Sequence, residues 1–290
     1  MRVAYFTAGR TGAGHVVRGL AIERALVRAG FVGDYRMFGP QLSFPVVQRD
    51  NYHVVPITPE EVLHPMRAPV TDLAFALMKF APDLLIADMF WAPLRYILPL
   101  PGCECWLMLR HCAPAWFVGT PQARFAAQQF DRIIAIEPLE HEVVRERIAP
   151  IVISNPEECR PSHALRQRLG ISEDQRLVAV VHAGQAGECR QLVPPARSDG
   201  VAIFNLFESD ALFPVAKWLP GADAVIAGAG YNTFWEAHWL GYSSRTSFTA
   251  FRRKMDDQGW RLDNCLGRPM PENGADVLAR WIVGGAATPR

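Results

Sequence analysis

The feature that most limits the fold of this chain is a series of short apolar runs separated by longer amphipathic segments. The first series of runs covers residues 3–7, 35–38, 53–57, 84–88, 105–109, 132–136 and 151–154. These runs are almost continuously apolar, which is typical of parallel strands covered by helices on both faces. Between the first two runs, apolar residues recur at helical spacing from Val16 to Leu26. The sequence therefore predicts an α/β fold built on a parallel sheet.

A second series of runs follows Asn155-Pro156, after a charged, proline-containing stretch. It predicts strands at 177–182, 201–206, 224–227 and 244–248, and helices over 163–169 and 275–283. A length of 290 residues suits one or two domains. We predict two Rossmann-like domains, 1–155 and a short 156–290, with the last helix a candidate to pack back on the first domain. Two such domains would enclose a ligand cleft at the carboxyl ends of their strands.

Charge and cysteine spacing exclude several classes of protein. Lys plus Arg total 30 and Asp plus Glu 29, so the net charge of +1 gives no basic field for a nucleic-acid partner. The six cysteines have no CxxC spacing, and the group Cys103, Cys105, His111 and Cys112 matches no standard zinc pattern, so we expect no metal. The sequence shows no signal peptide and no apolar run long enough to span a membrane, which predicts a cytoplasmic protein.

The first candidate motif lies between the first predicted strand and helix, in the sequence AGRTGAGH at 8–15. Gly12 and Gly14 allow the backbone to approach a ligand closely, and the helix start offers N–H groups to an anion. His15 stands at the mouth of that helix, where a histidine suits general-base catalysis near neutral pH. The alternative is a histidine that only begins the helix.

The second candidate motif, GAGYNTFWE at 228–236, follows a predicted strand and opens a helix that ends near Gly241. Backbone amides from Ala229 to Thr233 would cradle a diphosphate. Glu236 falls one turn into the helix, where a carboxylate accepts hydrogen bonds from both ribose hydroxyls. The alternative is an ordinary strand–loop–helix turn with an early-helix carboxylate.

Four further features carry weaker signals. Asp257 and Gln258 could bind sugar hydroxyls or merely begin a solvated helix, and Gly184 belongs to a loop, HAGQAGE, that faces the same expected cleft. Asp88 ends a strand at the cleft side, where it would orient His15 or an acceptor, or only cap a helix. An aromatic cluster is read as core or cleft wall, with an acceptor surface or a peripheral patch on the inner membrane face as alternatives; its members are Phe90, Trp91, Tyr96, Trp106, Trp116 and Phe117.

Together these motifs resemble the GT-B glycosyltransferases, and most of all the branch containing the N-acetylglucosaminyltransferase of the peptidoglycan lipid intermediate. The resemblance rests on GAGHVVRGLAIERAL at 12–26, GADAVIAGAGYNTFWEAHWLG at 221–241 and DDQ at 256–258. It implies two Rossmann-like domains facing a central cleft and His15 as the catalytic base. The implied donor residues are Gly228, Gly230, Tyr231, Asn232 and Glu236 for the diphosphate and ribose, Asp257 and Gln258 for the sugar, and Phe213 for the base pocket.

The function implied is an inverting, metal-independent glycosyltransferase that needs no cofactor. Its donor would be a nucleotide-sugar, with UDP favoured, and the acceptor hydroxyl and the oligomeric state are not specified. The chain is shorter than most members of that branch, and the connection from Gly187 to Gly200 is too short for a full helix of the usual kind. The GxGHVxR pattern also resembles the UDP-sugar hydrolase of pseudaminic acid synthesis, which uses water as acceptor. A third hypothesis is a non-catalytic nucleotide-sugar-binding subunit, against which His15 and Glu236 argue.

Overall fold

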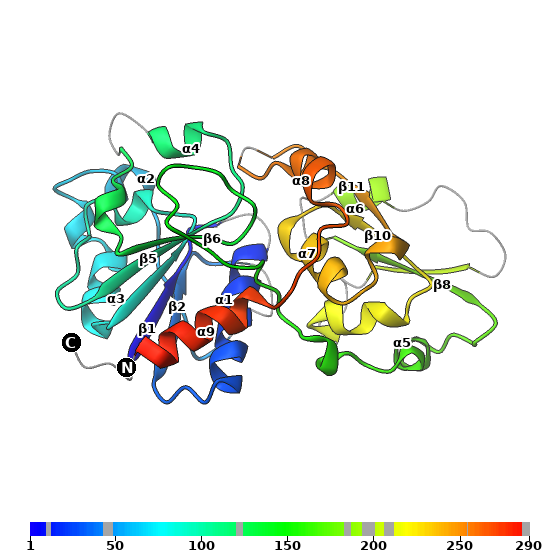
Figure 1. Ribbon diagram of the computed structural model, residues 1–290. Coiled ribbons are helices and arrows are strands. Elements are labelled where there is room, and N and C mark those ends of the chain that lie inside the picture. Colours follow the sequence, from blue (N-terminus) through cyan, green and yellow to red (C-terminus); the bar gives the residue numbers. More distant parts are fainter. Residues whose placement is uncertain are drawn as a thin grey trace. The chain divides into compact units, whose positions relative to one another are not determined.

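The structure is a computed structural model whose contacts divide the chain into two compact units. It describes residues 1–9, 13–42, 49–119, 124–182, 187–192, 201–205, 212–253 and 255–285, and of 201–205 the backbone alone. Unit 1 consists of Met1–Arg10, Ile22–Ala149 and Asp276–Arg290, and unit 2 of Thr11–Ala21 and Pro150–Ala275. Each unit has a parallel sheet of its own (Figure 1). Each unit also has its own buried hydrophobic cluster.

Unit 1 contains sheet A, in which all neighbouring strands are parallel. Its strands are β1 (Arg2–Phe6), β2 (Asp34–Gly39), β3 (Tyr52–Val54), β4 (Leu84–Asp88), β5 (Glu104–Leu109), β6 (Arg132–Ala135) and β7 (Glu146–Arg147). They lie in the order β3-β2-β1-β4-β5-β6-β7. The prediction of a parallel α/β sheet is confirmed, although no apolar run predicted the two-residue strand β7. The strand order reverses between β1 and β4, and open parallel sheets bind ligands beyond the carboxyl ends at such a point.

The two faces of sheet A are covered by different helices. Alternate residues of β1, β4 and β5 form one buried cluster with Leu73, Leu77 and Phe80 of α3 (Asp72–Phe80). On the opposite face, Trp106 of β5 packs edge-on against Trp281 of α9 (Gly274–Gly285), with ring centroids 6.5 Å apart. In Figure 1, α9 lies beside α1 (Gly14–Arg28), and Arg28 pairs with Asp276 at 2.7 Å.

Short helices complete the framework of unit 1. They are α2 (Pro59–Val62), α4 (Ala115–Val118), and the 3₁₀ turns η2 (Ala68–Val70), η3 (Ala92–Leu94) and η4 (Ala127–Gln129). Trp91 is buried within the core cluster, and Phe90 and Trp116 pack against it. These members of the predicted aromatic cluster therefore belong to the core of unit 1.

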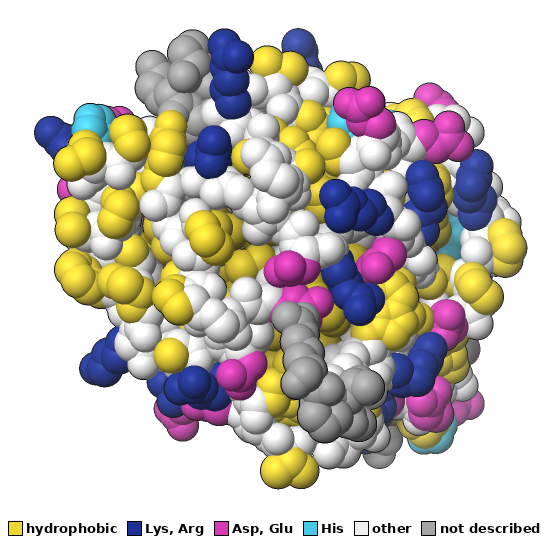
Figure 2. Space-filling view, turned by 60° about the vertical axis from the view of Figure 1, so that its left-hand side comes forward, with side chains coloured by type: hydrophobic (Ala, Val, Ile, Leu, Met, Phe, Trp, Pro, Cys, Tyr) yellow, Lys and Arg dark blue, Asp and Glu magenta, His cyan; other side chains and the backbone are white. Residues whose placement is uncertain are grey.

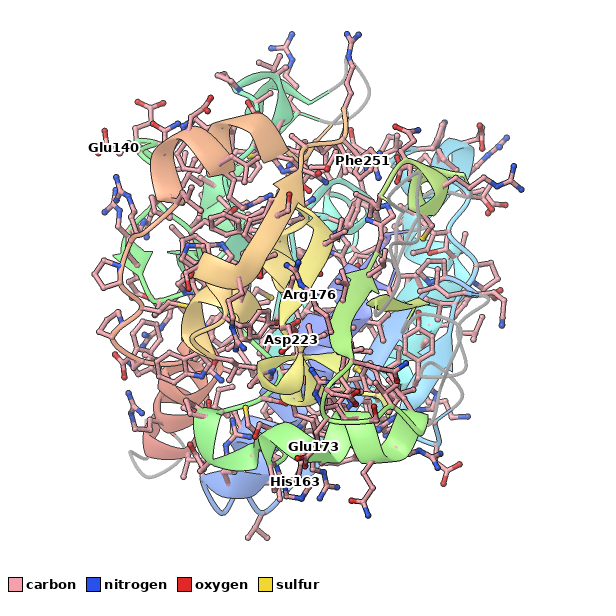
Figure 3. The ribbon with its side chains drawn as sticks, turned by 90° about the vertical axis from the view of Figure 1, so that its right-hand side faces the viewer. Glu140, His163, Glu173, Arg176, Asp223 and Phe251 are labelled. Atoms are coloured by element: carbon pink, nitrogen blue, oxygen red, sulfur yellow. The ribbon has the colours of Figure 1, made fainter. Side chains whose placement is uncertain are left out.

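Unit 2 contains sheet B, also wholly parallel. Its strands are β8 (Arg176–Val181), β9 (Val201–Asn205), β10 (Ala224–Gly228) and β11 (Thr246–Thr249), in the order β11-β10-β8-β9. The strand order reverses between β8 and β10, so the loops that follow these two strands flank the switch point of this sheet. In Figure 3, Phe251 lies just beyond β11, at the carboxyl end, whereas Arg176 and Asp223 mark the amino end.

Helices cover both faces of sheet B as well. The helices of unit 2 are α5 (Ser162–Leu169), α6 (Glu188–Leu192), α7 (Tyr231–Trp239) and α8 (Gln258–Cys265), with the 3₁₀ turns η5 (Pro156–Glu158), η8 (Val215–Gly221) and η9 (Ser243–Arg245). Leu165 of α5, Leu219 of η8 and Ala237 of α7 share one buried cluster with β8 and β10. Leu192 of α6 packs on the other face with Val180 and Phe251.

The segment 151–154, predicted as a strand, does not join a sheet. Its residues are buried, as in a strand, but its backbone binds side chains. The N–H of Ile151 donates to the Tyr231 hydroxyl at 2.8 Å. The Asn273 amide accepts from the Val152 N–H at 3.2 Å and donates to the Val152 carbonyl at 2.9 Å. The same amide donates to Asn155 at 2.8 Å and accepts from the Ala275 N–H at 2.9 Å, so Asn273 fixes this part of the chain.

The surface agrees with the near-neutral net charge. On the face shown in Figure 2, basic and acidic side chains are interspersed, and no extended basic patch is visible on it. Among the described residues, no helix is long and apolar enough to cross a membrane. The sequence expectations of cytoplasmic location and of no nucleic-acid partner stay predictions.

Candidate functional site

The loop between β10 and α7 carries most of the predicted donor residues. Gly228 ends β10, and Gly230 is the N-cap of α7, with extended backbone. The first-turn N–H groups of such a helix have no partner within the helix, and its positive dipole end favours an anion. The Ala229 N–H is an exception, because it already donates to the Thr249 carbonyl at 2.8 Å. This amide therefore has a protein partner, and the expectation that it binds diphosphate stays a prediction.

Glu236, one turn into α7, is a buried carboxylate. Its side chain is 8% exposed and has no hydrogen bond or ion pair to any residue that the structure describes. Burial raises the pKa of Glu236 from 4.5 to about 7. The neighbouring Tyr242 hydroxyl is buried and also lacks a hydrogen-bond partner in the described part of the chain. A carboxylate in this state is short of donors, which a ligand with hydroxyl groups would supply.

The first turns of α1 belong to unit 2 and contact the start of α7. The Asn232 side chain donates to the Gly14 carbonyl at 3.0 Å and accepts from Arg18 at 3.4 Å. The Arg18 guanidinium lies 4.8 Å from the centre of the Tyr231 ring. Residues of the two Gly-rich motifs are therefore in direct contact, and the Asn232 side chain binds α1.

His15 is 9% exposed and is held by Arg18. The guanidinium lies 2.7 Å from His15 Nδ1, and since arginine has only donors, Nδ1 accepts this hydrogen bond. A neutral imidazole in this arrangement carries its proton on Nε2. The lone pair that a general base needs therefore faces Arg18. Sequence reasoning did not single out Arg18, although its spacing of three residues from His15 on one helix places both side chains on one face.

The predicted sugar-binding pair takes part in local structure. The Asp257 carboxylate accepts from the Trp260 N–H at 2.9 Å and caps α8, which is the alternative that the sequence left open. Gln258 is 4% exposed; its Oε1 accepts from the Phe251 N–H at 2.9 Å, and its Nε2 donates to Asp256 at 3.2 Å. Gln258 nevertheless lies beside the donor loop, because Nε2 is 3.9 Å from the position of a Cβ on Gly230.

A fully buried arginine fixes this region to the donor loop. Arg261 of α8 donates to the Ala229 carbonyl at 2.8 Å and to the Asp256 carboxylate at 2.7 Å. Its guanidinium also lies 5.9 Å from the centre of the Tyr231 ring, so that ring has a buried arginine near it from α1 and another from α8. Helix arginines usually face solvent, so no local pattern predicts that Arg261 is buried.

A histidine lies opposite Gly228 at the switch point of sheet B. His182 directly follows β8, and its Nε2 is 2.6 Å from Glu188 of α6. Glu188 accepts two further hydrogen bonds from Arg253, at 2.5 and 2.6 Å. The Phe251 ring packs on the imidazole with centroids 4.8 Å apart. From the sequence alone, the loop after His182 is only a weak functional candidate.

The remaining predicted residues are distributed as follows. Asp88 is fully buried in unit 1 at the carboxyl end of β4 and accepts a hydrogen bond from the Tyr5 hydroxyl at 2.5 Å. Its expected role toward His15 stays a prediction. Phe213 is half-buried and lies two positions before Val215, the first residue of η8. Gly12 and Gly184 lie outside the described residues. Within the described residues, no three His, Cys, Asp or Glu side chains gather as a metal site would require.

Comparison with known proteins identifies the fold. No family model matches the chain, and no curated protein sequence matches it. The chain is similar to the crystal structure of glycosyltransferase VinC in complex with dTDP, with a TM-score of 0.54, 14% identity, and coverage of 100% of this chain and 92% of that one. The spinosyn forosaminyltransferase SpnP gives 0.59, 13% identity, and coverage of 99% and 91%. Phytolacca americana UGT2, complexed with UDP-2-fluoro-glucose and pterostilbene, gives 0.53, 12% identity, and coverage of 97% and 89%.

These similarities, with the two parallel sheets, show that the chain has the GT-B fold of nucleotide-sugar glycosyltransferases. At 12–14% identity they show the fold and assign no reaction to it.

Proposed function

We propose that this protein is an inverting glycosyltransferase that moves a sugar from a nucleotide-sugar to an acceptor hydroxyl. The observation that carries the proposal is Glu236, a buried carboxylate with a raised pKa and no partner among the described residues, one turn into a helix that begins at a Gly-rich loop. The two hydroxyls of a ribose would supply the missing donors. The diphosphate attached to that ribose would then lie toward the N-terminus of α7.

UDP is the favoured nucleotide, because the motifs resemble a branch that uses UDP-sugars. The VinC structure contains dTDP, so the thymidine nucleotide is the natural competitor in an assay. Phe213 is proposed to line the base pocket, and Asp257 and Gln258 to contact the sugar. For Gln258 this requires rearrangement, since both ends of its amide already bind protein groups.

In the proposed reaction, the acceptor oxygen forms a bond to the anomeric carbon while the bond from that carbon to the diphosphate oxygen breaks. The electron pair leaves with the diphosphate, and the first-turn amides of α7 stabilise the developing charge. His15 takes the acceptor proton. Its Nδ1 holds a hydrogen bond from Arg18, so either Arg18 leaves Nδ1 or the ring turns before His15 acts as a base.

Thermal denaturation with nucleotides tests the proposal. UDP or dTDP at about 100 times its dissociation constant should stabilise the protein by about 2.7 kcal/mol, whereas AMP at the same concentration should not. If neither nucleotide raises the melting temperature, the donor site is wrongly assigned.

A second assay decides between transferase and hydrolase. The wild-type protein is incubated with UDP-sugars in water alone and with added acceptors, and free sugar is measured. Slow release that an acceptor outcompetes supports the transferase. Rapid stoichiometric release in water alone would instead assign the hydrolase reaction.

A further inference from the structure

The group of His182, Glu188 and Arg253 stands at the switch point of sheet B and has no role in the function proposed above. The register of β8 and β10 pairs Val181 with Ala227, which places His182 opposite Gly228 at the carboxyl ends of both strands. A Cβ on Gly228 would lie only 2.4 Å from His182 Nδ1. The imidazole therefore fills the space that the glycine leaves, directly before the N-terminus of α7.

The hydrogen bonds of this group fix the proton on the ring. Glu188 accepts from Arg253 at both of its oxygens, and a carboxylate so paired accepts from His182 Nε2–H as well. Neutral His182 then presents an unprotonated Nδ1 on the side of Gly228. In the described part of the chain, Nδ1 has no hydrogen-bond partner, and the residue is 8% exposed.

An unprotonated Nδ1 and an ionised phosphate oxygen are both acceptors, so they cannot form a hydrogen bond without an added proton. On the protein side, Nδ1 of the imidazole can receive that proton. Among the described residues, the ring is surrounded by Glu188 of α6 at Nε2, by Arg253 after β11, which pairs with Glu188, and by the Phe251 ring and the Gly228 backbone. With a second proton, Nδ1–H would donate to the phosphate while Nε2–H stays on Glu188.

We infer that His182 is a ligand-contacting residue of the donor site, which takes up one proton from solution when a nucleoside diphosphate binds and donates Nδ1–H to a phosphate oxygen. This inference rests on the proposed function, because it places the diphosphate at the loop between β10 and α7. The imidazolium adds a positive charge where the leaving diphosphate gains negative charge. No bond other than the N–H bond is made or broken.

Three variants separate a phosphate contact from a purely structural role. His182→Gln keeps a donor near the Nε2 position for Glu188 but removes Nδ1. His182→Asn keeps a donor near the Nδ1 position but cannot take up a proton. His163→Gln is the matched control on the exposed side of α5, at the end of sheet B opposite Phe251 in Figure 3.

The measurement is titration calorimetry of UDP and uridine at pH 8.5, in two buffers with different ionisation enthalpies. At this pH Glu236, with a pKa of about 7, is already largely ionised and adds little to the proton count. Wild type and His163→Gln should take up protons with UDP and none with uridine. His182→Gln should lose that uptake and bind UDP about 10- to 100-fold more weakly, with uridine affinity unchanged. His182→Asn should lose the uptake but retain part of the affinity.

The outcomes distinguish the two proposals. If UDP binds wild type and His182→Gln with equal affinity and equal proton uptake, the inference is wrong and the donor site stands. If wild type binds neither UDP nor dTDP, the proposed function fails. The inference is then decided with inorganic pyrophosphate, since a pyrophosphate affinity that His182→Gln leaves unchanged would overturn it, whereas a His182-dependent affinity with proton uptake would support a phosphate site of another kind.

Discussion

Replacing Glu236 with glutamine should stabilise the folded protein above neutral pH and weaken its binding of nucleotide. The free carboxyl has an ordinary pKa of 4.5, which burial raises to about 7 in the fold. The folded state therefore binds the proton more tightly than the unfolded state does. The free energy of unfolding then falls as pH rises from about 4.5 to about 7, and at 1.36 kcal/mol per pH unit the total loss is about 3 kcal/mol.

Glu236→Gln removes this titration and keeps the shape of the side chain. The stability of the variant relative to wild type should thus increase by about 3 kcal/mol between pH 4 and pH 8. Urea unfolding at a series of pH values measures this difference. Glu173→Gln, the same change at an exposed position, is the control. A relative stability that does not change with pH would refute the view that Glu236 is buried without a partner.

The same variant should bind UDP more weakly, by about 1.5–3 kcal/mol, because a hydrogen bond to a charged acceptor is lost. A more stable protein that binds its ligand less well is expected where a functional group is held in an unfavourable environment. Thermal shift with UDP at pH 8 provides this measurement, and an unchanged shift would remove Glu236 from the ribose site.

Four further predictions concern other parts of the site. His15→Gln should lower kcat by about 100- to 10,000-fold while UDP affinity stays nearly constant, as steady-state kinetics and calorimetry would show. Asp257→Ala should cost about 1 kcal/mol in urea unfolding through the lost cap of α8, and Asp257→Ser should restore most of it. Gly228→Ala should cost about 1–3 kcal/mol, because the new methyl group meets His182; a second change, His182→Ala, should recover part of that loss in a double-mutant cycle. Turnover should be the same with and without EDTA, and restoration of a chelated enzyme by Mg²⁺ or Mn²⁺ would contradict the proposed role of α7.

The strands were predictable wherever an apolar run also belonged to a sheet, because continuous burial on both faces leaves a plain pattern. The segment 151–154 has the same pattern for another reason. It is buried by side chains of unit 2, and its backbone partners are Tyr231 and Asn273, which lie about 80 and 120 residues further along the chain. An apolar run alone does not indicate whether its backbone N–H groups bind another strand or a side chain, so the strand prediction for 151–154 fails.

The site was predictable where the chemistry depends on a short motif and not where it depends on distant contacts. The position of Glu236 after a Gly-rich loop is a local pattern. The burial of Arg18 and Arg261 around Tyr231 depends on two helices from opposite ends of the chain. Asp257 is a different case, because its capping role is also a local pattern: its carboxylate accepts from the N–H three residues later. The sequence therefore supported two interpretations of Asp257, a helix cap and a sugar ligand.

The buried amide of Asn273 also bears on the chemical ageing of the protein. Asn273 is followed by glycine, and in a flexible chain this pair readily cyclises when the glycine nitrogen attacks the asparagine side chain, with loss of ammonia. Here the Gly274 N–H donates to the Pro150 carbonyl, and the Asn273 amide is bound on both sides, so neither reacting group is free to approach the other. Conversion of Asn273 to aspartate would then occur only when this segment opens, and it would leave the Val152 carbonyl without its donor. The fraction of aspartate at position 273, measured by mass spectrometry in an aged sample, should therefore increase with the total time that this segment has spent open.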